Sequence, residues 1–136
     1  MGRIAVILLD TCAIIWDALD QEKLTENAKN AIAKADEHNA LIISDISIWE
    51  ISMLIKRSRI EVSTTPANFI NLFLESRSVS VISISPEIAE LSTNFGSEIN
   101  NDPADRVIAA TSIIHNARLV TADTNLRQAT LIDTIW

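Results

Sequence analysis

Four acidic residues stand at places in the sequence where their side chains could act together. Asp10 and Asp123 each follow an apolar run of strand length. Glu50 lies just over one turn into an expected helix, and Asp105 lies in the first turn of another. Asp10 read alone is more simply a helix N-cap, because Asp is favoured at that position. The other three acids favour a shared site, in which capping is either a second role for Asp10 or the role of Thr11.

Carboxylates gathered in this way would suit a hard divalent cation. Right-handed crossovers bring the carboxyl ends of parallel strands to one edge of a sheet, so the four side chains can converge on one pocket. Crowded carboxylates raise one another's pKa unless a cation lies between them. Oxygen ligands without His or Cys suit Mg²⁺ or Mn²⁺, and such an ion can polarise a phosphoryl oxygen and activate a bound water. The pattern predicts metal-assisted phosphoryl chemistry.

The composition is that of one globular domain over residues 1–136, with 48% hydrophobic and 21% charged residues. A net charge of −7 argues against a protein that coats nucleic acid through a broad basic face. The two glycines cannot form a glycine-rich phosphate cradle. The single cysteine excludes an internal disulfide and fits a reducing, cytoplasmic setting. No apolar segment approaches the roughly 18 residues of a membrane span.

Strand-like and helix-like segments alternate along the whole chain, which predicts an α/β fold. We expect a single three-layer domain whose mainly parallel central sheet of about five strands is flanked by helices. The expected strands cover residues 4–9, 40–44, 79–84, 118–121 and 131–136, the third of them less buried and the last at an edge. The expected helices cover about residues 11–19, 25–36, 45–57, 65–76, 85–95, 102–116 and 124–129.

The helix expected at residues 45–57 carries the most informative of the four acids. Its apolar residues form two stripes on opposite sides, which predicts burial on both. Glu50 lies near the middle of the stripe formed with Ile46, Trp49, Met53 and Leu54. A carboxylate there needs a partner or a cation, because an isolated buried charge is too costly.

Four motifs make the chain resemble PIN-domain ribonucleases of the VapC-like toxin kind, which occur in bacterial and archaeal toxin–antitoxin pairs. The motifs are LLDT at 8–11, SDISIWEI at 44–51, NDPADRVIAA at 101–110 and VTAD at 120–123. They follow the family's order over nearly the full length, and together they are specific although each alone is weak. The resemblance implies that the catalytic metal ligands are Asp10, Glu50, Asp105 and Asp123, with Thr11 and Ser44 as supporting hydroxyls.

The same resemblance implies a divalent-metal-dependent endoribonuclease that hydrolyses RNA phosphodiester bonds and leaves a 5′-phosphate and a 3′-hydroxyl. It also implies a cognate antitoxin protein, which inserts a basic or polar side chain into the acidic pocket, and a homodimer. The apolar helices at 11–19 and 66–76 are the candidate dimer surfaces.

The departures from the family pattern touch no candidate ligand. Ala104 stands where an aromatic residue is common, and Cys12 stands where several relatives carry His. Asn100 and Asn101 replace residues that are often basic. These changes weaken any transfer of substrate preference.

Several residues admit a plainer interpretation beside the functional one. Arg106 either contacts the substrate phosphate or orients a carboxylate, or it is a surface residue. Asp102 is expected to be an N-cap, because a helix-starting proline follows it. Trp16 and Trp49 are expected to be core or interface aromatics rather than base-stacking platforms. Cys12 is expected to be a small buried hydrophobe.

Two rival functions stand beside the nuclease. A non-catalytic PIN module that binds nucleic acid would keep the fold without turnover, and cleavage of DNA by the same site is a weaker possibility. A receiver-type phosphoacceptor also places an acid at a strand end with Mg²⁺. Against the receiver, the first strand lacks an adjacent acidic pair, and Lys56 is the last lysine in the chain.

Overall fold

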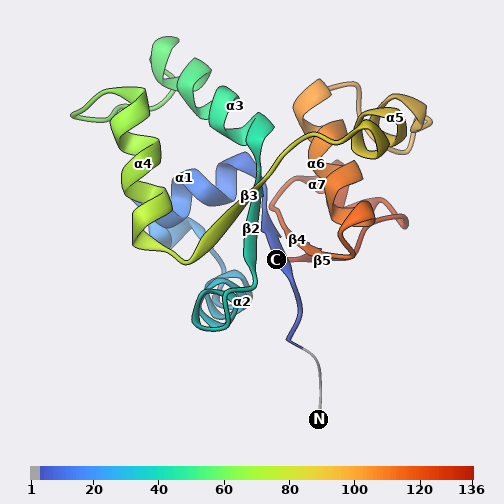
Figure 1. Ribbon diagram of the computed structural model, residues 1–136, viewed down its shortest axis with the longest axis horizontal. Helices are drawn as coiled ribbons and strands as arrows, with labels where there is room; N and C mark the ends of the chain where they lie inside the picture. Colours follow the sequence, from blue (N-terminus) through green and yellow to red (C-terminus); the bar gives the residue numbers. More distant parts are fainter. Residues whose placement is uncertain (1–3) are drawn as a thin grey trace.

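A computed structural model describes residues 4–136, and the first three residues of the predicted domain lie outside them. In it a five-stranded sheet separates two layers of helices (Figure 1). The strands are β1 Ile7–Leu9, β2 Leu41–Ser44, β3 Val79–Ile82, β4 Arg118–Val120 and β5 Thr134–Ile135. Their order is β3-β2-β1-β4-β5, and all four pairings are parallel. The predicted three-layer α/β fold is confirmed.

Three strands are shorter than the sequence predicts by two residues or more, because a strand extends only as far as its neighbours. β1 begins at Ile7, opposite Leu41 and Arg118, where the adjacent strands begin. The preceding Ile4 is 38% exposed rather than part of a buried strand. β3 ends at residue 82 and β5 spans only two residues, since β2 and β4 offer no further partners there. Both lie at sheet edges, as predicted for β5, and the position of β3 agrees with its predicted lower burial.

Each helix begins at a side chain that caps its free backbone N–H groups. The helices are α1 Thr11–Leu19, α2 Glu26–Glu37, α3 Asp45–Lys56, α4 Pro66–Ser76, α5 Pro86–Asn94, α6 Pro103–Ile114 and α7 Thr124–Gln128, with a 3₁₀ turn, η1, at Gln21–Lys23. The caps are Asp10, Thr25, Ser44, Thr65, Ser85, Asp102 and Asp123. α4, α5 and α6 also start with the proline that suits a first helical position.

Alternate residues of the buried strands supply two separate cores. Ile7 and Leu9 of β1 pack under α1 to α4 on one face. Leu8 of the same strand packs with Ile108 of α6 and Leu126 of α7 on the other. Figure 1 shows these two groups of helices on opposite sides of the sheet. Burial on both faces explains why the strands read as uninterrupted apolar runs.

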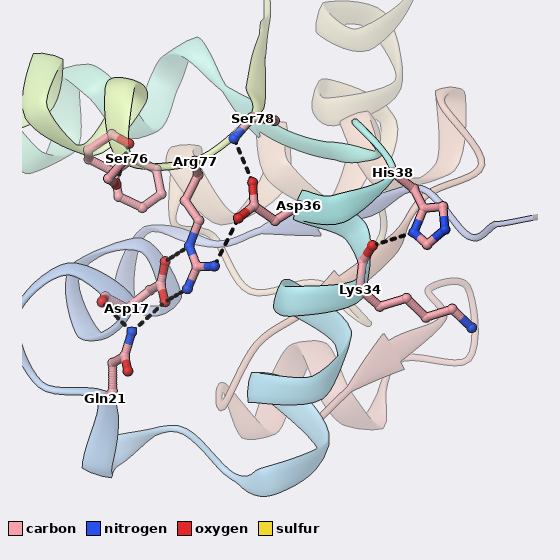
Figure 2. A network of polar contacts seen from close by, with 9 residues as sticks. Asp17, Gln21, Lys34, Asp36, His38, Ser76, Arg77 and Ser78 are labelled. Carbon is pink, nitrogen blue, oxygen red and sulfur yellow. Dashed lines mark hydrogen bonds and ion pairs between the residues drawn. The ribbon is translucent and has the colours of Figure 1, made fainter.

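A network of ion pairs and hydrogen bonds connects elements of the layer formed by α1 to α4 (Figure 2). Arg77, which follows α4, donates to both carboxylate oxygens of Asp17 in α1, at 2.8 and 3.1 Å. It also donates to Asp36 in α2 at 3.1 Å, and the backbone N–H of Ser78 donates to the other oxygen of Asp36. One guanidinium therefore ties α1 and α2 to the segment that leads into β3.

The burial predicted on both sides of α3 is only partly observed. Ser47 and Ile51 are its buried residues, and they lie one turn apart on a single side. Trp49 is 60% exposed, so the core interpretation of this residue is wrong, while the interface interpretation stays a prediction. Ile46 packs against one core and Ile48, Leu54 and Ile55 pack against the other, all of them partly buried, so both apolar stripes are covered in part. Among residues 4–136, no helix has the length and apolarity to cross a membrane.

Candidate active site

The site lies where the strand order changes direction. β2 and β3 follow on one side of the central strand β1, whereas β4 and β5 lie on the other. The carboxyl ends of β1 and β4 are adjacent, with Leu9 paired to Val120. α1 leaves β1 toward one face, and α7 leaves β4 toward the other. Open α/β sheets form their ligand crevices at such a switch point.

A pocket of about 390 Å³ opens at this point and is lined by the four predicted acids. Asp10 and Asp123 come from the ends of β1 and β4, Glu50 from α3 and Asp105 from α6. We call this the acidic pocket. Thr11 also lines it, whereas Ser44 and Arg106 do not. The structure thus brings together acids that four different elements carry.

Asp10 is both a cap and a pocket residue. Its Oδ1 accepts the backbone N–H of Ala13 at 2.8 Å, which caps α1, and the residue is only 7% exposed. Burial raises the pKa of Asp10 to about 6, and the charges of Asp105 and Asp123 add to this. Hydrogen bonds from Thr121 and Ala13 offset only part of the effect. In the metal-free protein the charge on Asp10 therefore lacks compensation.

Thr121 joins two of the acids, and sequence reasoning gave it no role. It is fully buried, hydrogen-bonds Asp10, and accepts the backbone N–H of Asp123 at 3.0 Å. The contact arises because Val120 pairs with Leu9, which places the next residue of each chain segment side by side. The sequence signal that could have identified Thr121 is a polar residue at the end of a buried strand, two residues before an acid.

Thr11 lies beside Glu50 and is itself paired with Ser47 of α3. The hydroxyls of Thr11 and Ser47 lie 2.9 Å apart and are buried. Burial raises the pKa of Glu50, the Thr11 hydroxyl lowers it in part, and the charge of Asp102 raises it further. Ser47 was missed, although a polar residue on the buried line of a helix needs a partner. Ser44 instead caps α3 by accepting the N–H of residue 46 at 3.2 Å.

Asp105 is held by an amide from the preceding loop. The Nδ2 of Asn100 donates to its Oδ2 at 2.9 Å. Burial raises the pKa of Asp105 to about 6, the Asn100 hydrogen bond lowers it in part, and neighbouring acids raise it again. The sequence interpretation treated Asn100 only as a departure from the family pattern.

Arg106 has a structural role here rather than the predicted substrate contact. Its guanidinium donates to the backbone carbonyls of Ser92, Phe95, Gly96, Ile99 and Asn100, at 2.8–3.4 Å. Arginine has five N–H donors, and each of these carbonyls takes one. With every donor engaged on the loop, none is directed at a phosphate in the pocket.

Two further expectations change at the pocket wall. Cys12 is exposed and lines the pocket, so its predicted burial is wrong. Partial desolvation and the nearby acids raise the pKa of its thiol to about 11, which keeps it protonated and unsuited to bind a metal as thiolate. Trp16 is partly buried: it also lines the pocket and packs against Trp136, with ring centroids 5.7 Å apart.

The donor set fits a hard divalent cation. It consists of carboxylates, and the raised pKa values of Asp10 and Asp105 reflect negative charge that a cation would offset. Among residues 4–136, no group of three or more acids, His or Cys is placed to hold a metal ion as the side chains stand. Asp10 and Asp123 each give one carboxylate oxygen to a helix cap.

A second cavity of about 420 Å³ lies between α1 and α4 and includes Asp17 and Arg77 in its wall. These two groups are paired with each other in the network of Figure 2. Paired charges of this kind stabilise packing rather than supply an acid, a base or a metal ligand. The acidic pocket is therefore the candidate active site.

Known proteins resemble this chain in sequence and in fold. The PIN domain family model matches residues 7–131. Ribonuclease VapC22 from Mycobacterium tuberculosis (strain ATCC 25618 / H37Rv) is 34% identical over 121 residues, which is 89% of each protein. The structure of VapBC2 from Rickettsia felis bound to a promoter DNA fragment matches with a TM-score of 0.71 at 19% identity, covering 94% of this chain and 96% of that chain. A toxin–antitoxin complex from Klebsiella pneumoniae matches with a TM-score of 0.63 at 22% identity, covering 93% and 94%.

Proposed function

Because the chain belongs to the PIN domain family, we propose that it is a divalent-metal-dependent endoribonuclease and the toxin of a toxin–antitoxin pair. The observation that carries the proposal is the convergence of Asp10, Glu50, Asp105 and Asp123 on one pocket from four separate elements. The similarity to a protein named as a ribonuclease supports RNA as the substrate.

In this proposal the four carboxylates hold one or more Mg²⁺ or Mn²⁺ ions. Such an ion supplies polarisation of a phosphoryl oxygen and a bound water of lowered pKa. The hydroxyls of Thr121 and Thr11 lie beside Asp10 and Glu50, and each lowers the pKa of its neighbouring carboxyl group. Among the described residues, no Lys or Arg side chain lines the pocket, and its charged lining residues are all acids. A phosphate group can approach such a surface only when cations offset the negative charge, which is the physical reason for metal dependence.

The proposal includes a cognate antitoxin and a homodimer. A basic or polar antitoxin side chain suits a pocket this negative, and the match to a toxin–antitoxin complex supports such a partner. For the dimer, Leu19 at the end of α1 and Leu72 on α4 are 47% and 54% exposed, which leaves apolar surface on both candidate helices. A reducing, cytoplasmic setting belongs to the same proposal. Light scattering on the purified chain tests the dimer.

A cleavage assay tests the proposed activity. End-labelled RNA and single-stranded DNA of the same sequence are incubated with the purified protein, with Mg²⁺, Mn²⁺ or EDTA. We expect RNA cleavage with either ion and none in EDTA. The variants Glu50→Gln, Asp105→Asn and Asp123→Asn should lose cleavage. Asp133→Asn is a matched control, because Asp133 is an exposed acid paired with Arg118 outside the pocket.

The same assay, together with RNA binding and phosphodonor labelling, separates the rival functions. Cleavage of the DNA but not the RNA would replace the substrate class and keep the metal site. Binding of RNA without cleavage by the metal-loaded wild-type protein would favour the non-catalytic PIN module. Transfer of phosphate from a small phosphodonor to Asp10 would favour the receiver-type phosphoacceptor.

A further inference from the structure

Asn100 uses every one of its polar groups. Its Nδ2 donates to Asp105 Oδ2 at 2.9 Å and to Asn125 Oδ1 at 3.2 Å, and its backbone N–H also donates to Asn125 Oδ1 at 2.9 Å. Its Oδ1 accepts the N–H of Asp102 at 2.8 Å, and its carbonyl accepts Nε of Arg106 at 2.8 Å. With the amide reversed, an oxygen would face the Asp105 carboxylate, so only this orientation satisfies both ends.

Asn100 connects the elements that carry two of the pocket acids. Asp105 lies in the first turn of α6. Asn125 lies in the first turn of α7, which Asp123 caps. The side chain of Asn125 also donates to the carbonyl of Glu98 at 3.2 Å. The position of the Asp105 carboxylate is thereby tied to the helix that begins at Asp123.

The loop that presents Asn100 is itself fixed. Phe95 and Ile99 are buried in the second core, 9% and 1% exposed. The guanidinium of Arg106, one residue after Asp105, holds five carbonyls of the segment 92–100, as described above. A side chain on a loop anchored this firmly can orient a neighbour, whereas one on a mobile loop could not.

We propose that Asn100 is a positioning residue, which holds the Asp105 carboxylate in the orientation that binds the divalent ion, with Arg106 fixing the loop that presents it. The inference rests on the proposed function. The amide of Asn100 donates only to the Oδ2 atom of Asp105, and among the described residues no hydrogen bond reaches Asp105 Oδ1. A carboxylate has lone pairs on both oxygens, so Asp105 can accept the amide and bind an ion at once. Partners of this kind around metal-binding carboxylates orient them and sustain metal affinity.

Asn100→Ser separates the orientation of Asp105 from the shape of the loop. A serine hydroxyl can still accept the N–H of Asp102, as serine does in turns, so the turn is kept. The serine side chain is too short to replace the amide of Asn100, which donates to Asp105. Asn101→Ala is the matched control. Asn101 is exposed and lies next in the same loop, and within residues 4–136 its side chain makes one hydrogen bond, accepted from Arg106 at 3.5 Å.

Calorimetric titration of the metal-free proteins with MnCl₂ tests the proposal. We expect Asn100→Ser to raise the Mn²⁺ dissociation constant by about tenfold, the lower end of the usual range for such partners. Its melting temperature in EDTA should stay within about 2 °C of the wild type, as for a partly exposed polar change. Asn101→Ala should match the wild type in both. In RNA cleavage, Asn100→Ser should need more Mn²⁺, and saturating Mn²⁺ should restore the rate.

Three results would overturn this role for Asn100. They are unchanged Mn²⁺ affinity in Asn100→Ser, an equal loss of affinity in Asn101→Ala, and a loss of cleavage that saturating Mn²⁺ does not restore. In each of these cases the wild-type protein still binds Mn²⁺ and cleaves RNA, so the proposed function stands. Absence of Mn²⁺ binding by the wild-type protein would instead overturn the proposed function and this inference with it.

Discussion

Replacing Asp10 by Asn should stabilise the metal-free protein while it removes cleavage. Asp10 is buried, and its pKa is raised to about 6 because its charge is poorly solvated and has acidic neighbours. At neutral pH the folded protein must keep this group ionised at a free-energy cost. Asn removes the charge and keeps the shape. It also keeps the cap on the N–H of Ala13, since Asn caps helices as well as Asp does.

The size of the effect follows from the pKa shift. The ordinary pKa of this carboxyl is 3.8, and its pKa in the folded protein is about 6. A shift of this size corresponds to about 3 kcal/mol at pH 7.5, because each pKa unit is worth about 1.4 kcal/mol. The free energy of unfolding should rise by up to this amount in Asp10→Asn. For a chain of 136 residues the melting temperature should rise by about 10 °C.

The assay is urea or thermal unfolding in EDTA at pH 7.5 and pH 5, with Asp133→Asn as the control. At pH 5 the folded wild-type protein already holds the proton on Asp10, so the gain should fall to about half. Asp133 is exposed and outside the pocket, and its replacement should change stability little. Adding Mn²⁺ at pH 7.5 should stabilise the wild-type protein and leave Asp10→Asn unchanged.

Equal or lower stability of Asp10→Asn at pH 7.5 would show that the charge on Asp10 does not destabilise the folded protein. It would mean that contacts within the protein compensate the charge on Asp10 without a cation. A gain of the same size at both pH values would also contradict it, because the effect would then not come from ionisation.

Three further predictions concern the whole protein in EDTA. The free energy of unfolding should fall by about 2 kcal/mol from pH 5 to pH 7.5, because Asp10 and Asp105 have raised pKa values. The stability that their protonated forms contribute is lost as pH rises through the folded pKa of about 6. A flat urea-unfolding profile over this window would contradict the prediction. Arg77→Ala should cost about 3 kcal/mol in urea unfolding, since it leaves the buried Asp17 unpaired, and a loss below 1 kcal/mol would argue that water compensates Asp17. Arg106→Lys should cost about 2 kcal/mol, because three donors replace five and leave loop carbonyls unpaired; a melting temperature equal to the wild type would show that the clamp is dispensable.

Local signals predicted most of the fold. Uninterrupted apolar runs such as Leu8 and Leu9 require helices on both faces of the sheet, and the two cores supply them. Capping residues followed by proline gave the starts of α4, α5 and α6. The four acids were found because strand ends and the first two turns of helices are positions that parallel topology brings to one edge.

The remaining features depend on contacts between distant segments. The exposure of Trp49 and Cys12 is decided by which surfaces other elements cover, and periodicity does not contain that information. Thr121 meets Asp10 only through the register of two strands, and Ser47 meets Thr11 only through the packing of two helices. Such partners are recognised once tertiary neighbours are known.

The central claim is that the acidic pocket cleaves RNA through a divalent ion held by its carboxylates. The most direct test is the initial rate of cleavage of labelled RNA by the wild-type protein and Asp10→Asn, each measured with Mn²⁺ and with EDTA. We expect cleavage only by the wild-type protein with Mn²⁺, while folded Asp10→Asn gives the EDTA background. Cleavage by Asp10→Asn at the wild-type rate, or by the wild-type protein in EDTA, would contradict it.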